Sequence, residues 1–173
     1  RDSARAEAGF PLFGHELEGE YYATTLTEAG YGFVPRFHVP FFIGRNAYIR
    51  RVTPQKRKLV RLRGQGKKSV RPGHLILDDA KEPAGVVTSF AYLDDVDYNF
   101  VALAYVDVRT PSEPGRKMLG LREKEHPGRD AVAPDRLVEL TAMTRFPTEA
   151  ERNGWPARYR SRPASAPAAV AAT

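Results

Sequence analysis

The feature that most constrains the fold is a series of short apolar segments between residues 56 and 147, separated by turns that contain Pro or Gly. The segments with the composition of β-strands are 58–62, 74–77, 85–90, 100–106 and 136–143. The turns between them are marked by Pro72-Gly73, Glu82-Pro83 and Pro114-Gly115. Several short strands with this spacing predict a compact antiparallel barrel or sandwich.

Two stretches depart from this pattern. Between residues 116 and 135, charged residues, Pro and Gly are crowded together, and we expect a long irregular excursion between two strands. Residues 148–173 are rich in Pro, Ala, Arg and Ser, and we expect a largely disordered tail because little of it can be buried. Trp155 is the residue best suited to anchor this tail, and we expect it to pack against the barrel.

The composition is that of a protein that folds. The 173 residues are 42% hydrophobic and 28% charged, close to the averages for globular proteins. No cysteine is present, which excludes disulfides and thiolate metal sites. The histidines lack metal-ligand spacing and no phosphate-binding loop occurs, which disfavours a metal site and a nucleotide hydrolase. Without an apolar run of about 18 residues or a signal peptide, we expect a soluble, cytoplasmic protein with no membrane contact.

The net charge of +6 is unevenly distributed along the chain. No acidic residue occurs between Glu28 and Asp78, a stretch that contains many lysines and arginines. We therefore expect one face or edge with a strongly positive potential. This face could be a solvated surface, a nucleic acid-binding surface or a docking site for an acidic partner. Nucleic acid is the least favoured partner, because no aromatic RNA-binding pattern, zinc knuckle or recognition helix accompanies the charges.

The first 52 residues combine two helical patterns with a middle part rich in Gly and Pro. Residues 2–8 are mostly helix formers and stop at Gly9, which is typical of a helix end. Residues 46–51 form a second helical pattern that should end before Pro54. The chain starts without Met, and its first helix has no preceding element, so we expect it to begin in the middle of a longer protein.

Four motifs in this region follow one another in a specific order: RAEAG at residues 5–9, LFGHEL at 12–17, TEAG at 27–30 and FIGRNA at 42–47. In residue type, order and spacing they resemble the motifs of the aminomethyltransferase family, the T-proteins of the glycine cleavage system. The resemblance extends through Val87-Thr88-Ser89 and residues 102–106, and covers the chain to residue 147 apart from 116–135.

The resemblance implies an α+β fold that is mostly β. Residues 1–52 would be the carboxy-terminal part of the folate-binding aminomethyltransferase domain, which is incomplete in this chain. Residues 56–147 would form a small T-protein-like carboxy-terminal antiparallel β-barrel domain, followed by the tail at 148–173.

The resemblance also implies a function. The chain would be the carboxy-terminal part of a tetrahydrofolate-dependent aminomethyltransferase, or of a related methyltransferase or demethylase, that moves a one-carbon unit to tetrahydrofolate. The implied partners are folate, a methyl or aminomethyl donor and an acidic lipoyl carrier protein. In the family, the reaction depends on a carboxylate of the amino-terminal half. We therefore expect no catalytic residue in this chain and no activity from it alone.

Arg5 is the main candidate for folate binding, because the matching arginine of the family contacts the folate. A guanidinium suits this role, since its planar fork can hold a carboxylate through two hydrogen bonds. The alternative is an ordinary surface arginine paired with Asp2 or Glu7.

Two further positions are candidates for the same site. Arg45 follows Gly44 at a predicted helix start, where an anion can bind, although a capping contact or an interdomain ion pair would also explain it. Either Tyr21 or Tyr22 could line the pocket, with core packing as the alternative, because neighbouring residues of an extended segment face opposite ways.

The sequence departs from the family pattern at Leu26, Phe90 and residues 94–98, and these departures leave the identity of the substrate undetermined. The alternative hypothesis is a non-catalytic barrel module that docks an acidic partner through its basic face. The two hypotheses differ in whether the chain forms part of a folate site.

Overall fold

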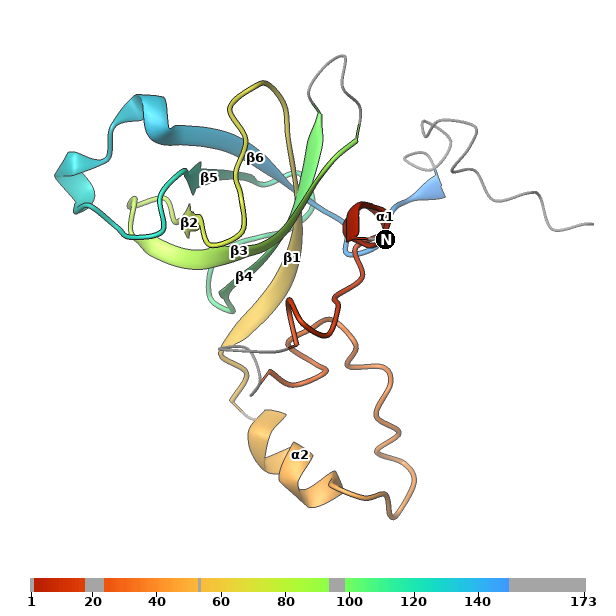
Figure 1. Ribbon diagram of the computed structural model, residues 1–173. Coiled ribbons are helices and arrows are strands. Elements are labelled where there is room, and N and C mark those ends of the chain that lie inside the picture. Colours follow the sequence, from red (N-terminus) through yellow and green to blue (C-terminus); the bar gives the residue numbers. More distant parts are fainter. Residues whose placement is uncertain (1, 18–23, 53, 94–98, 150–173) are drawn as a thin grey trace, which may run out of the picture.

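The structure is a computed structural model that describes residues 2–17, 24–52, 54–93 and 99–149. Within these residues the helices are α1 (Asp2–Ala8) and α2 (Arg45–Val52), with short 3-10 helices η2 (Arg129–Ala131) and η3 (Pro134–Arg136). The strands are β1 (Arg57–Gly64), β2 (Leu75–Leu77), β3 (Pro83–Tyr92), β4 (Phe100–Asp107), β5 (Lys117–Leu121) and β6 (Leu137–Met143). Figure 1 shows a barrel with α1 against its wall and α2 beyond one end.

The strands form a closed antiparallel barrel in the order β1-β4-β3-β2-β5-β6. The barrel closes where β6 pairs with β1, with Arg61 opposite Met143 and Arg63 opposite Thr141. Closure gives every strand a paired neighbour on both sides, so the barrel has no edge strand. The prediction of a mostly β fold with a small antiparallel barrel is confirmed, and the sandwich alternative is wrong.

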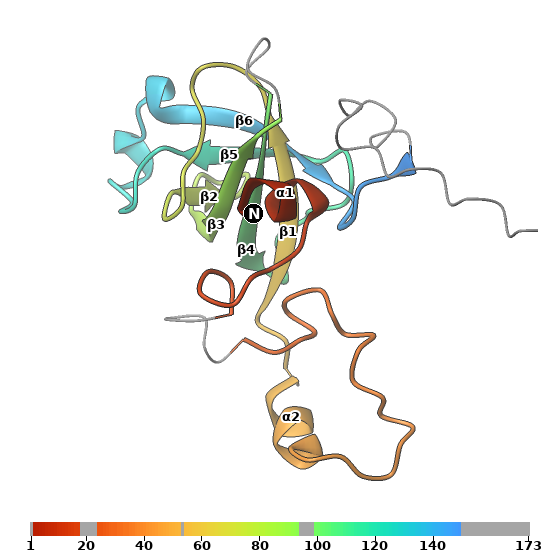
Figure 2. The ribbon, with the colours of Figure 1, turned by 45° about the vertical axis from the view of Figure 1, so that its right-hand side comes forward.

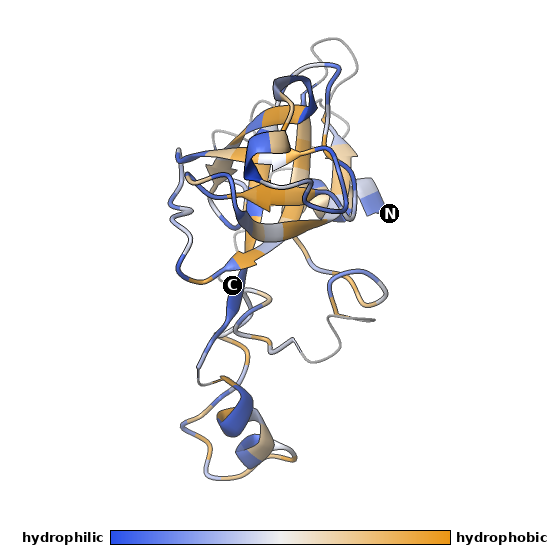
Figure 3. Ribbon diagram, turned by 90° about the vertical axis from the view of Figure 1, so that its left-hand side faces the viewer, coloured by the Kyte–Doolittle hydropathy of each residue, from blue (hydrophilic) through white to orange (hydrophobic). Residues whose placement is uncertain are grey.

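Alternate residues of each strand fill the barrel interior, as expected for strands with a period of two. The inward positions of β4 are Phe100, Ala102, Ala104 and Val106, and those of β1 include Val60 and Leu62. Together with apolar residues of the other strands they form one buried cluster. Figure 3 shows this concentration of hydrophobic residues in the strands, whereas α2 is largely hydrophilic.

The outer face of β4 is also buried, which explains why this strand is apolar at almost every position. Helix α1 and the segment after it lie on this face (Figure 2). Ala6 packs with Ala91 and Val101, while Leu103 and Tyr105 form a second small cluster with Leu59. Helix α1 and the barrel thus share buried surface, and the barrel wall positions the polar groups described below.

The expectation of an irregular excursion over residues 116–135 is wrong for its first part. Residues 117–121 form β5, which pairs with β2 on one side and β6 on the other. Met118 and Gly120 face the interior, where a Cβ on Gly120 would lie 2.6 Å from Val70. The apolar run, residues 118–121, is only four residues long and is flanked by charged residues, so the flanking composition obscured it.

The basic stretch does not form one positive face. The cations of α2 lie at one end of β1, and those of the loop after β1 lie at its other end (Figure 1). Arg61, in the middle of β1, is only 3% exposed. Because β1 crosses the full height of the barrel, residues that are close in sequence are carried to opposite ends of the molecule.

Candidate functional site between the amino-terminal segment and the barrel

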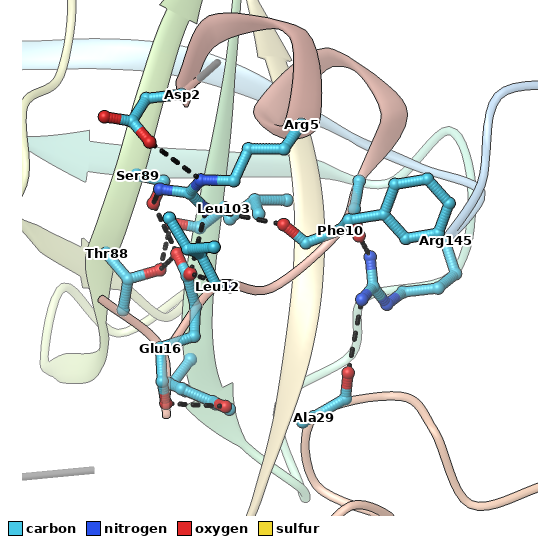
Figure 4. Close-up of polar contacts among 12 residues, drawn as sticks. Asp2, Arg5, Phe10, Leu12, Glu16, Ala29, Thr88, Ser89, Leu103 and Arg145 are labelled. Atoms are coloured by element: carbon cyan, nitrogen blue, oxygen red, sulfur yellow. Dashed lines mark hydrogen bonds and ion pairs between the residues drawn. The ribbon is translucent and has the colours of Figure 1, made fainter. Parts of the chain in front are cut away.

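A buried carboxylate, that of Glu16, organises the contact between the amino-terminal segment and the barrel (Figure 4). Its side chain is fully buried, and it accepts hydrogen bonds from Arg5 Nη1 (2.9 Å) and the backbone N of Leu12 (3.0 Å) through Oε2. Its other oxygen, Oε1, accepts from the hydroxyls of Thr88 (2.7 Å) and Ser89. These donors compensate the cost of burying the charge.

Arg5 uses both terminal nitrogens of its guanidinium within the protein. Nη1 pairs with Glu16, and Nη2 donates to the Ser89 hydroxyl at 2.8 Å. Nε lies 3.6 Å from Asp2 Oδ1, and the Arg5 side chain is 10% exposed. Arg5 therefore ties α1 to β3, and the predicted pairing with Asp2 is a minor contact beside the one with Glu16.

A register shift in β3 explains how two adjacent residues reach the same carboxylate. Val87 lies opposite Ala104 and Ser89 lies opposite Leu103, so Thr88 is an extra residue in the ladder. Neighbouring residues of a regular strand face opposite sides, but an inserted residue changes the direction of the side chains around it. Both hydroxyls are thereby aimed at Glu16.

Tyr105 of β4 completes this network from the barrel side. Its hydroxyl donates to the backbone carbonyl of Glu16 at 3.2 Å. Burial raises the pKa of Tyr105 to about 12, and this effect is partly offset by a hydrogen bond with Thr24 and by the Arg57 guanidinium over the ring. The phenol is thus held in its neutral form as a hydrogen-bond donor at ordinary pH.

Arg145, which follows β6, joins the two Glu-Ala-Gly sequences of the amino-terminal segment. It donates through Nη1 to the carbonyl of Gly9 and through Nη2 to that of Ala29 at 3.2 Å. Gly9 and Gly30 have positive φ angles of 76° and 80°. A Cβ at Gly9 would lie 2.4 Å from the Arg145 carbonyl oxygen, and one at Gly30 would lie 2.4 Å from Arg145 Nε.

The electrostatic environment of Arg145 reflects its position beneath the two turns. Burial lowers the pKa of Arg145 from its ordinary value, and the same enclosure raises that of Tyr31. The guanidinium lies 5.0 Å from the centroid of the Phe146 ring. Arg145 therefore serves as an internal tie between β6 and the two motif turns.

Arg45 lies apart from this network, at the first position of α2. Its Nη2 lies 3.5 Å from the carbonyl oxygen of Phe37, and Arg45 is not among the hydrogen-bond donors to Glu16. Helix α2 is anchored instead by Tyr48, whose hydroxyl contacts the backbone N (3.0 Å) and hydroxyl (2.8 Å) of Thr27. The structure thus does not bring Arg5 and Arg45 together, because α1 lies on the barrel wall and α2 beyond its end (Figure 1).

A hollow of about 420 Å³ lies beside α2. It is lined by Leu26, Pro35, Phe42, Ile43, Gly44, Ala47, Tyr48 and Arg51. A second hollow, of about 760 Å³, lies at one end of the barrel, where most of its charged residues are ion-paired, such as Arg116 with Asp79 and Lys117 with Glu139. Neither hollow includes Arg5.

Some predicted residues lie outside the described residues, namely Tyr21, Tyr22 and Trp155. Sequence reasoning also missed the central residues of the network, Glu16, Thr88, Ser89 and Arg145. Glu16 and the Thr-Ser pair were part of recognised motifs, so the motifs were a usable signal. Arg145 carried no such signal, because the local sequence around an arginine does not reveal which distant turn its side chain will contact.

Neither a membrane-spanning helix nor a metal-binding group of side chains is found in the part of the chain that the structure describes. No helix there combines the length and apolar character needed to cross a membrane. No group of three or more His, Asp or Glu residues there is arranged to hold a metal ion.

Comparisons with known proteins identify the relatives of this chain. No protein-family model matches it. It is 38% identical over 117 residues to an aminomethyltransferase of Saccharopolyspora erythraea, a match covering 66% of this chain and 30% of that protein. It is 37% identical over 108 residues to an aminomethyltransferase of Cutibacterium acnes, covering 62% of this chain and 28% of that protein. The chain thus spans less than a third of these curated relatives.

The fold also has a counterpart among solved structures. The crystal structure of glycine cleavage system aminomethyltransferase T from Bartonella henselae superposes with a TM-score of 0.63 at 24% identity. The match covers 83% of this chain and 36% of that chain. By sequence and fold together, the chain belongs to the aminomethyltransferase family, that of the glycine cleavage T-protein, and corresponds to its carboxy-terminal portion.

Proposed function

We propose that this chain is the carboxy-terminal part of a tetrahydrofolate-dependent aminomethyltransferase, or of a close methyltransferase or demethylase relative. The observation that carries the proposal is the 38% identity to an aminomethyltransferase over two thirds of the chain, in a match that covers only 30% of that relative. Tetrahydrofolate would accept the one-carbon unit. The donor would be an aminomethyl group on an acidic lipoyl carrier protein, or another methyl donor.

The exposed apolar side chains support the idea that residues 1–52 are one part of a larger domain. Phe33, Phe41 and Ile43 are 72%, 77% and 95% exposed, and they lie on or near the segment that leads into α2. Side chains of this size are seldom exposed in groups unless another surface covers them. In the proposed enzyme, the amino-terminal portion would cover this group and supply the reactive carboxylate.

The described residues fit a folate only in part. The guanidinium groups of Arg5 and Arg45 have the right chemistry for its carboxylates, and the hollow beside α2 offers apolar walls for a ring. The two terminal nitrogens of Arg5, however, already have protein partners in Glu16 and Ser89. Folate binding by Arg5 therefore stays a prediction, with a competing role as a positioning residue within the network.

The proposal is tested with a chimera in which this chain replaces the corresponding part of the Saccharopolyspora erythraea aminomethyltransferase. We expect a cooperatively folded chimera that tetrahydrofolate stabilises in proportion to its binding and that turns over the donor. The 173-residue chain alone should be inactive. A folded chimera without tetrahydrofolate binding would overturn the proposal.

Two variants of the chimera separate the two roles of Arg5. If Arg5 contacts folate directly, Arg5→Ala should weaken folate affinity at least about tenfold. Glu16→Gln, which keeps the Arg5 guanidinium, should weaken it much less. Calorimetric titration at a temperature at which both variants are folded provides the measurement. Equal losses in the two variants would show that Arg5 acts only through the fold.

A further inference from the structure

We propose that a cationic cluster on the outside of the barrel docks a carboxylate-rich segment of a protein partner. The cluster consists of Arg71, His74, Arg122 and Lys124. The proposal does not depend on folate binding, because these residues lie in the loops that precede β2 and follow β5, and none of them contributes to the network around Glu16.

Backbone pairing brings the members of the cluster together. Gly73 N donates to the Val87 carbonyl at 2.8 Å, and Leu75 N donates to that of Glu123 at 3.1 Å. Residues 71–75 are therefore held between β3 and residues 122–124. Gly73 has a φ of 88°, and a Cβ there would lie 3.2 Å from Lys124 Cε, so the lysine stem lies directly against this glycine.

Arg71 and His74 are held in place by short contacts. The Arg71 guanidinium carbon lies 4.1 Å above the centroid of the Phe90 ring and 5.4 Å from that of Tyr92. The backbone N of Arg71 donates to His74 Nδ1 at 3.0 Å. A neutral His74 ring with Nδ1 as acceptor carries its proton on Nε2, which makes that atom a donor.

The positive charge of the cluster is not offset by an ion pair among the described residues. Burial lowers the pKa of His74, and Arg122, Lys124 and Arg71 lower it further, in that order. Glu123 is bonded to Arg136 at 2.6 Å. Among the described residues, no carboxylate forms an ion pair with the three cations. An anion docked there would therefore meet cations that are not already paired.

The surroundings favour carboxylates over nucleic acid. Binding of single strands needs aromatic faces on which bases can stack. The Phe90 ring is enclosed by Arg71, by Tyr92 in an edge contact at 4.9 Å and by Phe100 at 5.4 Å. What the cluster presents to solvent is positive charge, which an Asp- and Glu-rich segment complements.

The test titrates the 173-residue chain with a hexaglutamate peptide and follows the His74 imidazole by NMR. The peptide should raise the pKa of His74, because a bound anion offsets the three cations, and the effect should weaken as salt is added. The double variant Arg122→Gln/Lys124→Gln should raise the pKa of His74 without peptide and weaken peptide binding at least about tenfold.

The matched control is Arg36→Gln/Arg50→Gln, which removes the same charge from exposed positions near α2. It should leave both the His74 pKa and the peptide affinity close to those of the unchanged chain. Equal weakening in the two double variants would overturn the proposal in favour of diffuse charge attraction. Tighter binding of an oligonucleotide of equal charge, with the same dependence on Arg122 and Lys124, would overturn it in favour of a nucleic acid surface.

Discussion

At the scale of single residues, the central feature is the pair formed by Arg5 and Glu16. The side chain of Glu16 is fully buried and that of Arg5 is 10% exposed, so neither charge is well solvated. A buried pair adds little net stability compared with apolar residues of the same shape, but the loss of one partner leaves the other charge without compensation. The pair therefore acts mainly by positioning α1 on the barrel.

Removing the charge of Glu16 should be costly. We expect Glu16→Gln to lower the free energy of unfolding by about 3 kcal/mol, because Arg5 would keep its charge in a buried site. Urea unfolding followed by circular dichroism provides the measurement. The control is Glu139→Gln, whose carboxylate pairs with Lys117 at an exposed site and should change stability by about 0.5 kcal/mol or less. Equal effects of the two substitutions would contradict the role given to Glu16.

Because of Tyr105, the free energy of unfolding should fall as the pH becomes alkaline. Its pKa is about 12 in the folded chain against an ordinary value of 10.0, so the unfolded chain releases this proton first. The stabilisation is complete below pH 10 and is lost as the pH rises through 12, by up to about 2–3 kcal/mol. Urea unfolding at pH 8 and pH 11 should show about half of this loss, because pH 11 lies midway between the two pKa values, and Tyr105→Phe should reduce it. An unchanged slope in the variant would contradict the assignment.

At the scale of elements, the two Glu-Ala-Gly turns both end in a glycine with positive φ that lies against Arg145. In the second turn, Thr25 and Glu28 bond each other reciprocally as in a capping box, with Glu28 N to Thr25 Oγ1 at 3.2 Å and Thr25 N to Glu28 Oε2 at 2.9 Å. The Glu28 carbonyl then accepts from Leu59 N of β1 at 2.9 Å. Each turn ends in a glycine against Arg145, so β6 and β1 together hold the amino-terminal segment.

The turn glycines should not tolerate a side chain. Gly30→Ala places a Cβ within 2.4 Å of Arg145 Nε at a positive φ, and we expect a loss of about 2–3 kcal/mol. Gly115→Ala is the control, since its φ is also positive at 92° but nothing lies within 4 Å, and it should cost only about 1 kcal/mol. Chemical denaturation compares the two variants. The difference in stability loss between the two variants should shrink when Arg145 is also replaced by Ala. An unchanged difference in the Arg145→Ala background would show that Arg145 is not its cause.

At the scale of the whole molecule, a well-filled barrel carries an amino-terminal segment that is only partly covered. One side of this segment is buried on β4, while the part leading into α2 exposes large apolar side chains. Helix α2 itself has no buried residue. The barrel and the turns around Arg145 should therefore be the stable part of the chain, and the region of α2 its least stable described part.

The exposed apolar group should cause self-association. We expect the chain to associate at concentrations of about 10–100 μM, because large exposed apolar side chains favour contact with a second copy. Phe41→Ser together with Ile43→Ser should reduce the association without lowering barrel stability. Sedimentation velocity over a concentration series measures it. A monomeric unchanged chain throughout the series would contradict this expectation.

Local sequence was sufficient for most of the fold. The helices predicted at 2–8 and 46–51 are observed as Asp2–Ala8 and Arg45–Val52, since capping residues and prolines act within one turn. Five of the six strands were also predicted, because strand-forming residues between turns report local backbone preference. The strand at Lys117–Leu121 was missed, because its pairing with β2 and β6 decides its conformation more than its own five residues do.

By itself, the sequence determined the barrel class, the helix ends and the family resemblance, because these depend on residue type and spacing along the chain. Only the tertiary structure decided what the polar residues contact. It assigned Arg5 to Glu16, brought Arg145 to two distant glycines and separated the basic residues to opposite ends of β1. Such contacts join residues as many as 136 positions apart, and they arise from chain topology, which local preferences do not encode.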